Sequence, residues 1–284
     1  MQEVLRERLE HFKKNFDIFG IKGMSDKDRQ IAEYVAAQLS IFKTGAIKSW
    51  SFVNLDTAIT GALDNLKLLG DDVVVAAKGV TTKKFLPIEA TSFSYSCNIA
   101  YDDSRPFSKG LGVVNYFKVP FYLESITADI FLAHEFIHAL KDTNFNEYIL
   151  HNSLADVIPL FFELVQISEK PEKQKAFLNV RMMLLNNSKK DYKMATDNMA
   201  RNKNDKDLYE VLQGVSGQYL SSFYYSLILF NIYRSDPALV LQAVRKVLNH
   251  EMTTLEMLNS LGIYQENNDK IVDREFKFIR KSLR

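Results

Sequence analysis

Apolar residues recur at helical spacing from the first third of the chain onward. After Ser25 they fall at steps of three and four residues, at Ile31, Val35, Leu39 and Phe42. This spacing places them on one face of a helix. Asp28 follows Ser25 by three residues, which approximates a capping box at a helix start. The pattern predicts one helix over residues 26–42, and the same spacing predicts another over 55–69.

The period of the pattern changes to two residues between Thr91 and Tyr101. Apolar residues there alternate with small or polar ones, at Phe93, Tyr95, Cys97, Ile99 and Tyr101. Alternation is typical of a half-buried strand, and residues 113–119, closed by Pro120, are a candidate partner strand. The sequence therefore predicts a small β-sheet at this point.

Helical periodicity returns at Ser125 and continues to Lys141. Further helices are predicted near residues 152–168, 172–187, 218–234, 237–249 and 253–261. Pro237 after Asp236 is a favourable helix start, and the polar segment 187–206 is predicted to be a mobile connection. The whole pattern indicates a mainly α fold with a small β-sheet.

Composition and charge exclude several classes of protein. Hydrophobic residues make up 46% of the chain and charged residues 25%, the balance of an ordinary globular protein. The net charge of +1 offers no field that would recruit nucleic acid or an anionic membrane. No apolar run approaches the roughly 18 residues of a membrane span, and Cys97 is the only cysteine. We therefore expect a cytoplasmic protein with neither nucleic acid nor membrane as partner.

The chain carries no internal repeat and no Gly/Ser-rich linker. We expect a single catalytic domain over residues 1–284 with two lobes. The N-terminal lobe of helices and strands would cover about 1–120. The helical lobe with the candidate active site would cover about 121–284.

The segment His134-Glu135-Phe136-Ile137-His138 carries the clearest chemistry. Residues four apart on an α-helix are rotated by only about 40°, so both imidazoles would lie on one face and could bind one tetrahedral Zn²⁺. Glu135 is offset from that face and is the candidate general base. Zinc lowers the pKa of its water toward about 7, and a nearby carboxylate then takes the proton as the water attacks a carbonyl.

The surroundings of this motif are apolar on nearly every side of the helix. They comprise Ile126, Ile130, Leu132, Ala133, Phe136, Ile137 and Leu140. Such a helix is buried, and two histidines with a glutamate inside it need partners. A metal satisfies all three groups at once, whereas a purely structural role needs separate hydrogen-bond partners for each. The setting favours a metal site over a chance occurrence of the motif.

Three segments resemble the thimet oligopeptidase and oligoendopeptidase family of zinc peptidases. Residues 127–140 are similar to that family's active helix, although Ile137 replaces the usual Gly and Lys141 stands where a further His is common. Residues 155–163 are similar to its third-ligand helix, and residues 216–227 to its tyrosine-rich helix start. A histidine that precedes those tyrosines in the family is missing here.

The resemblance implies a zincin-like fold with two lobes around a cleft and a peptide or unfolded protein as substrate. It implies Asp156 as the third zinc ligand with Glu163 supporting it, or Glu163 itself as the ligand. The family spacing favours Glu163, whereas the acidic pair and Pro159 between its members favour Asp156. The family's tyrosines stabilise the tetrahedral intermediate, which makes Tyr219 and Tyr224 candidates, with Tyr225 next to them.

The sequence thus predicts a zinc metallopeptidase with His134 and His138 as ligands, Asp156 or Glu163 as the third, and Glu135 as base. Two alternatives stay open. One is a catalytically silent binding protein on the same scaffold, suggested by Ile137 and the missing His. The other is a structural helical protein without a metal.

Overall fold

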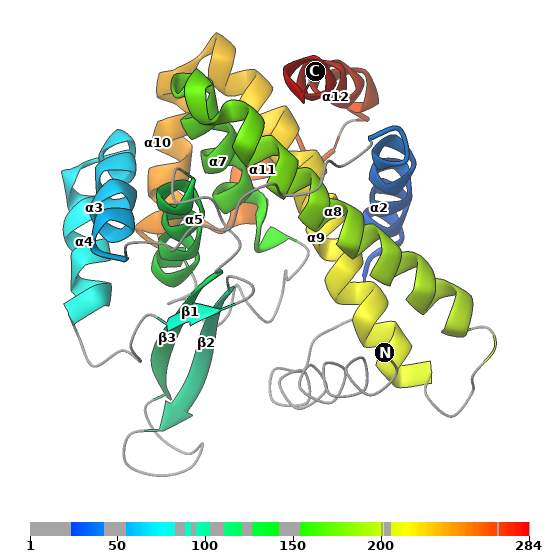
Figure 1. Cartoon of the computed structure of the whole chain (residues 1–284), viewed down its shortest axis with the longest axis horizontal. Coiled ribbons are helices and arrows are strands. Elements are labelled where there is room, and N and C mark those ends of the chain that lie inside the picture. The colour runs from blue at the N-terminus through cyan, green and yellow to red at the C-terminus, as the bar shows by residue number, and fades with distance from the viewer. Residues whose placement is uncertain are drawn as a thin grey trace.

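The structure is a computed structural model of the whole chain (Figure 1). It describes residues 24–42, 55–82, 89–91, 95–102, 111–120, 127–141, 154–199, 201, 206–265 and 267–283.

Helices make up most of the described chain. Their bounds are α2 (Asp26–Leu39), α3 (Leu55–Leu66), a 3₁₀ turn (Lys67–Leu69), α4 (Asp71–Thr82), α5 (Ala128–Lys141), α7 (Val157–Glu169), α8 (Pro171–Met199), α9 (Lys206–Ser235), α10 (Pro237–Leu248), α11 (Thr254–Ser260) and α12 (Asp269–Leu283). The two longest helices, α8 and α9, pack along each other. In Figure 1, α3 and α4 lie on one side of the molecule, α2 and α12 on the other, and α5 and α7 between them.

Local sequence explains where several helices begin. The Ser25 hydroxyl accepts a hydrogen bond from the Asp28 backbone N–H at 3.1 Å, so α2 begins where the capping pattern predicts. Asp236 caps α10 through the Leu239 N–H, with Pro237 in the first turn. The predicted helix starts at Asp26 and Pro237 are therefore confirmed, while α2 ends at Leu39, three residues before the expected Phe42.

Helix α5 lies at the centre of the described core. It packs against the helices α3, α4, α7 and α10, and against the strands β2 (Tyr95–Asp102) and β3 (Leu111–Pro120). Of its residues whose surroundings are described, all are buried except His138, which is half-buried. The apolar surroundings predicted for this helix are confirmed, and its polar side chains are accordingly placed inside the protein.

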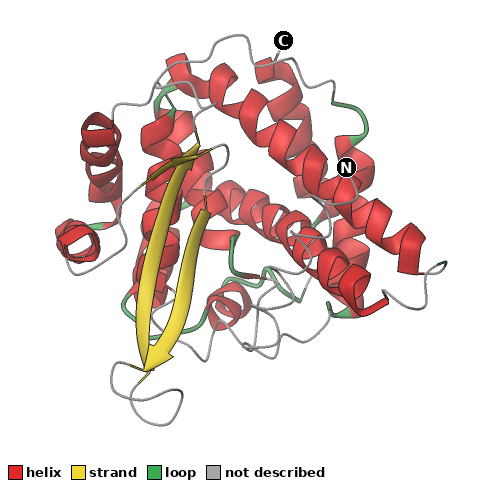
Figure 2. Ribbon diagram, turned by 60° about the horizontal axis from the view of Figure 1, so that its bottom comes forward, coloured by secondary structure: helices red, strands yellow, loops and turns green. Residues whose placement is uncertain are grey.

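The backbone between Glu89 and Pro120 forms three paired strands, which Figure 2 shows along one side of the helices. They are β1 (Glu89–Thr91), β2 (Tyr95–Asp102) and β3 (Leu111–Pro120), in the order β1-β3-β2. β2 runs antiparallel to β3, with Tyr95 opposite Lys118, and β1 runs parallel to β3.

We predicted a mainly α fold with a small β-sheet and a zincin-like pair of lobes around a cleft. This fold class is wrong for the residues whose side chains the structure describes. The residues described with their side chains are 86% helical, with 10 helices and no strand. A small cavity among the described residues lies between α7, α8, α9 and α12, lined by Leu164, Phe230 and Phe278 rather than by the motif.

The predicted mobile connection over residues 187–206 is corrected for residues 187–199, which continue helix α8 to Met199. Helix α9 begins at Lys206, and residues 200 and 202–205 lie outside the described residues. A polar segment can continue a helix when one side of that helix still packs on a neighbour. Tyr192 and Ala195 are buried and form that packed side here.

Among the described helices, none combines the length and the apolar character needed to cross a membrane.

Two helical glycines give a test of this packing. A Cβ at Gly61 in α3 would lie 2.8 Å from Cβ of Asp129 in α5, and Asp129 is held by Lys173 at 2.9 Å. We expect Gly61→Ala to lower the free energy of unfolding by roughly 1–2 kcal/mol, because overpacking outweighs the gain in helix propensity. Urea unfolding of the full chain measures this.

The matched control is Gly214→Ala in α9, where an added Cβ meets no atom within 4 Å. This substitution should raise the free energy of unfolding by up to about 1 kcal/mol. Equal effects of both substitutions would contradict the close approach of α3 to α5.

Candidate metal centre

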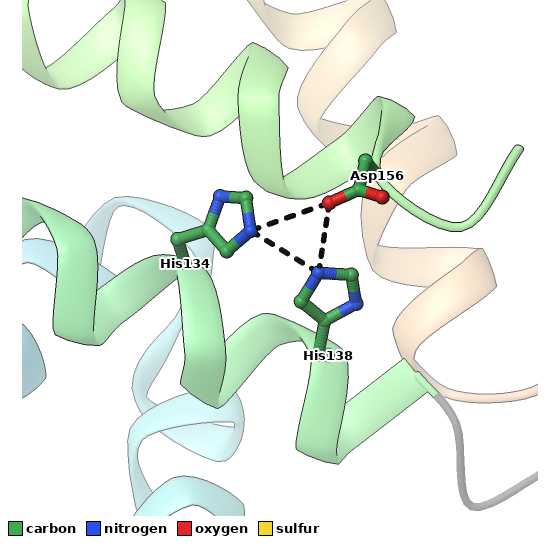
Figure 3. A group of neighbouring side chains, drawn as sticks. All are labelled: His134, His138 and Asp156. Atoms are coloured by element: carbon green, nitrogen blue, oxygen red, sulfur yellow. Dashed lines mark hydrogen bonds and ion pairs between the residues drawn. The ribbon is translucent and has the colours of Figure 1, made fainter. Parts of the chain in front are cut away.

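Helix α5 presents His134 and His138 one turn apart and facing each other (Figure 3). Their Nε2 atoms are 3.1 Å apart. The ring centroids are 4.8 Å apart, with the rings inclined at 67°. Both histidines of the motif therefore lie on one face of α5, and their Nε2 atoms converge.

Asp156, at the start of α7, completes the cluster from the opposite side. Its Oδ1 lies 3.2 Å from Nε2 of His138 and 3.5 Å from Nε2 of His134. The three residues form a group whose donor atoms all lie close enough to hold one metal ion. The cluster is accessible on this side, since the side chain of Asp156 is 25% exposed.

The sequence places Asp156 at this position through Pro159. A proline has no N–H and is tolerated in the first turn of a helix, so it favours a helix start just before it. Asp156 is the N-cap residue of α7, but its side chain makes no capping hydrogen bond. An N-cap aspartate usually contributes about 1 kcal/mol by accepting such a bond. Here the carboxylate faces the imidazoles instead.

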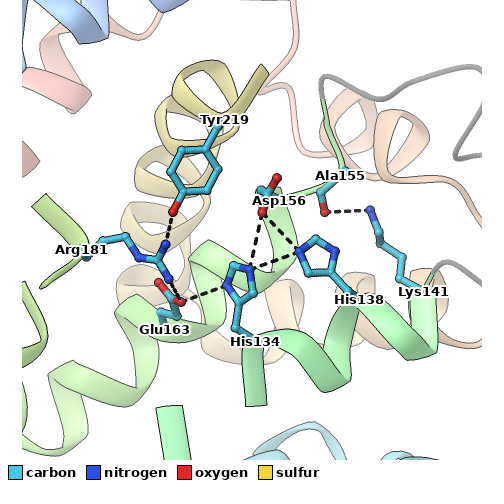
Figure 4. Close-up of polar contacts among 8 residues, drawn as sticks. All are labelled: His134, His138, Lys141, Ala155, Asp156, Glu163, Arg181 and Tyr219. Atoms are coloured by element: carbon cyan, nitrogen blue, oxygen red, sulfur yellow. Dashed lines mark hydrogen bonds and ion pairs between the residues drawn. The ribbon is translucent and has the colours of Figure 1, made fainter. Parts of the chain in front are cut away.

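Glu163 lies two turns further along α7 and contacts the other side of the His134 ring (Figure 4). Its Oε1 is 2.9 Å from Nδ1 of His134, off the N–H axis of the ring, so the contact is mainly electrostatic. Arg181 of α8 donates to the same carboxylate oxygen and also to the hydroxyl of Tyr219 in α9. The ring of His134 therefore lies between Asp156 at Nε2 and Glu163 at Nδ1.

Lys141 connects the end of α5 with the turn before Asp156. This buried lysine donates from Nζ to the backbone carbonyl of Ala155 at 2.8 Å. Because Lys141 follows His138 by three residues, the bond links the second histidine of the motif to the backbone next to the third donor (Figure 4).

Opposed charges shift the pKa values inside the cluster. Burial by itself lowers the pKa of His134, but the carboxylates of Glu163 and Asp156 outweigh it, and the pKa is raised. Burial by itself raises the pKa of Asp156, but its hydrogen bonds with His134 and His138 hold that pKa well below the usual range. The cluster is thus an anionic pocket that attracts a positive charge, either a proton or a metal ion.

The donor separations fit a tetrahedral ion. With zinc–nitrogen and zinc–oxygen distances near 2.0–2.1 Å, neighbouring ligand atoms of a tetrahedron lie about 3.3 Å apart. The three separations here are 3.1, 3.2 and 3.5 Å. Two imidazole nitrogens and one carboxylate oxygen are also a donor set that zinc accepts in catalytic sites, with a fourth position left for water or substrate. The residues present therefore fit the ion.

Glu135 is 5% exposed and follows directly after His134. Within the part of the chain that the structure describes, it forms no hydrogen bond or ion pair.

The structure separates the two predicted tyrosines. Tyr219 is linked by Arg181 to Glu163, beside the cluster. Tyr224 instead donates from its hydroxyl to Asp269 at 2.9 Å and accepts from the Asn268 N–H. We therefore correct the prediction for Tyr224: the start of α12 holds its hydroxyl. Neighbouring Tyr225 contacts Asp28 rather than the histidines.

Sequence reasoning missed Arg181 altogether. It lies in α8, outside every motif segment. Its apolar neighbours Val180 and Met182 could have indicated that the side chain is buried. Sequence reasoning noted Lys141 only as a departure from a family pattern. The spacing of three residues from His138 could have indicated that Lys141 shares the face of the motif.

The chain matches no protein-family model, and no curated protein sequence or solved structure is significantly similar to it, so the candidate site stands on its own geometry.

Proposed function

We propose that the protein is a zinc-dependent hydrolase that cleaves peptide bonds, with His134, His138 and Asp156 as the metal ligands. One observation carries the proposal: three donor atoms from two helices converge with separations of 3.1–3.5 Å. Two of the donors come from a His-Glu-x-x-His motif, whose glutamate is buried beside them.

Asp156 is preferred over Glu163 as third ligand for a geometric reason. Asp156 approaches Nε2 of both histidines, whereas Glu163 approaches Nδ1 of His134. A histidine that binds a metal through one nitrogen commonly has a carboxylate at the other, which fixes the ring and makes it a better ligand. Glu163 has that supporting position.

A zinc ion bound here would acidify a water molecule and polarise the carbonyl of a peptide bond. The other contributions come from the chain itself. Glu135 accepts the proton of the attacking water and later delivers it to the leaving amine. Tyr219 is the remaining candidate for a hydroxyl donor toward the oxyanion. The apolar core around α5 keeps the local dielectric low, which strengthens each of these interactions.

The substrate class, a peptide or unfolded protein, rests on the resemblance of three segments to zinc peptidases. The near-neutral net charge supports this, because it provides no field for a polyanionic substrate.

We expect the purified full chain, loaded with zinc and desalted, to contain one zinc per chain by elemental analysis. His138→Ala and Asp156→Ala should each lose most of it, because a three-ligand site cannot spare one ligand. Removal of zinc by a chelator should lower the melting temperature, since binding at 100 times Kd contributes about 2.7 kcal/mol. His250→Ala, a histidine far from α5 in the sequence, should keep its zinc. A wild-type chain that takes up no zinc would refute the proposal.

We expect Glu135→Gln to lower kcat on a quenched-fluorescence peptide library by roughly 10²–10⁴-fold, because the general base is lost. Its zinc content should stay at the wild-type level, since Glu135 is not a ligand. Glu172→Gln, which alters an exposed glutamate on α8, should cleave as the wild type does. If the wild type binds zinc but cleaves nothing in the library, the protein is the catalytically silent binding protein instead.

A further inference from the structure

Arg181 is an unusual residue for the interior of a helical protein. It lies on α8, is 4% exposed, and is flanked by the buried apolar residues Val180 and Met182. Its guanidinium carbon lies 4.9 Å from the ring centroid of Phe131 and 5.8 Å from those of Phe177 and Tyr219. Aromatic faces fix the plane of a guanidinium by cation–π attraction. The side chain is therefore held in one orientation.

From that orientation Arg181 makes two hydrogen bonds with different nitrogens. Nη2 donates to Oε1 of Glu163, and Nη1 donates to the hydroxyl of Tyr219. Glu163 is 1% exposed, so the permanent positive charge of Arg181 offsets the cost of burying its carboxylate in the core. The same oxygen of Glu163 contacts Nδ1 of His134. One guanidinium thus determines where the partner of His134 lies.

The hydrogen bond from Arg181 also orients the hydroxyl group of Tyr219. The tyrosine oxygen accepts from Arg181, so the hydroxyl hydrogen is left to donate in another direction. A hydroxyl fixed in this way is a preorganised donor, which is the kind of group that stabilises developing negative charge.

Stability alone is a poor explanation for this arrangement. Arg181 Nε is buried and has no hydrogen-bond partner among the described residues, and an unsatisfied buried donor lowers stability. Buried ion pairs can often be replaced by apolar residues without loss of stability. The feature that an apolar pair could not supply is the fixed carboxylate at His134.

Resting on the proposed function, we propose that Arg181 is the positioning residue of the metal centre. It holds Glu163 against Nδ1 of His134, so that Nε2 faces the metal position, and it orients the hydroxyl of Tyr219 for the substrate. Arg181 touches neither the metal position nor any of the three ligands directly. It acts through Glu163 and Tyr219.

The test is zinc affinity of the full chain, measured by competition with a chromophoric chelator. Arg181→Gln and Glu163→Gln should each weaken zinc binding by roughly 10–100-fold, the usual effect of losing a supporting partner. Arg181→Lys should bind with intermediate affinity, because an ammonium keeps the charge but cannot make both bonds. The double variant Arg181→Gln with Glu163→Gln should bind no more weakly than Glu163→Gln alone, because both changes remove one interaction.

The chain contains a matched control. Arg234 of α9 donates to Glu275 of α12, which is 1% exposed, and no histidine within the described chain forms an ion pair with Glu275. Arg234→Gln should lower the melting temperature and leave zinc affinity unchanged. Tyr219→Phe should leave zinc affinity unchanged and lower kcat rather than raise KM.

The proposed function and the positioning role of Arg181 are overturned by different results. If the wild type binds no zinc, the proposed function fails and this inference fails with it. If the wild type binds zinc and folded Arg181→Gln binds it equally well, or if the two losses add in the double variant, only the positioning role is overturned. Should Arg181→Gln not fold, Arg181→Lys decides: wild-type zinc affinity in that variant overturns the role, and weakened affinity supports it.

Discussion

The candidate centre depends on the requirement that buried polar groups find partners. Helix α5 is buried by neighbouring helices, and it brings two imidazoles and a carboxylate into that interior. Asp156, Glu163 and Arg181 meet most of this requirement. Each approaches from a helix other than α5, so the polar cluster also fixes how α5, α7 and α8 lie relative to one another. The same polar contacts therefore set both the packing of these three helices and the geometry of the candidate site.

Within the cluster the polar contacts form an ordered series. Asp156 faces one nitrogen of His134, Glu163 faces the other, and Arg181 balances Glu163. The charges alternate in sign outward from the proposed ion, which lowers the cost of burying each of them. Glu135 is the exception, because no described partner compensates its burial.

The helices beyond this centre support it in different ways. The pair α8 and α9 delivers Arg181 and Tyr219 to the same point from residues far apart in the chain. The start of α12 instead engages Tyr224 through Asp269, so two tyrosines of one helix serve different parts of the molecule. Five residues on an α-helix correspond to a rotation of about 140°, which explains why they cannot face the same site.

Local sequence determined the elements whose signals are local. Apolar spacing and the Ser25 cap set α2, Pro159 set the start of α7, and the four-residue spacing put His134 and His138 on one face. Only the tertiary structure showed that Asp156 approaches Nε2 of His134 and Glu163 approaches Nδ1, because the two acidic residues give the same signal in the sequence. It alone also brought Arg181 to the partner of His134, and it alone showed that α5 lies at the centre of the packed helices. These outcomes depend on contacts between segments distant in sequence, and periodicity within a segment carries no information about such contacts.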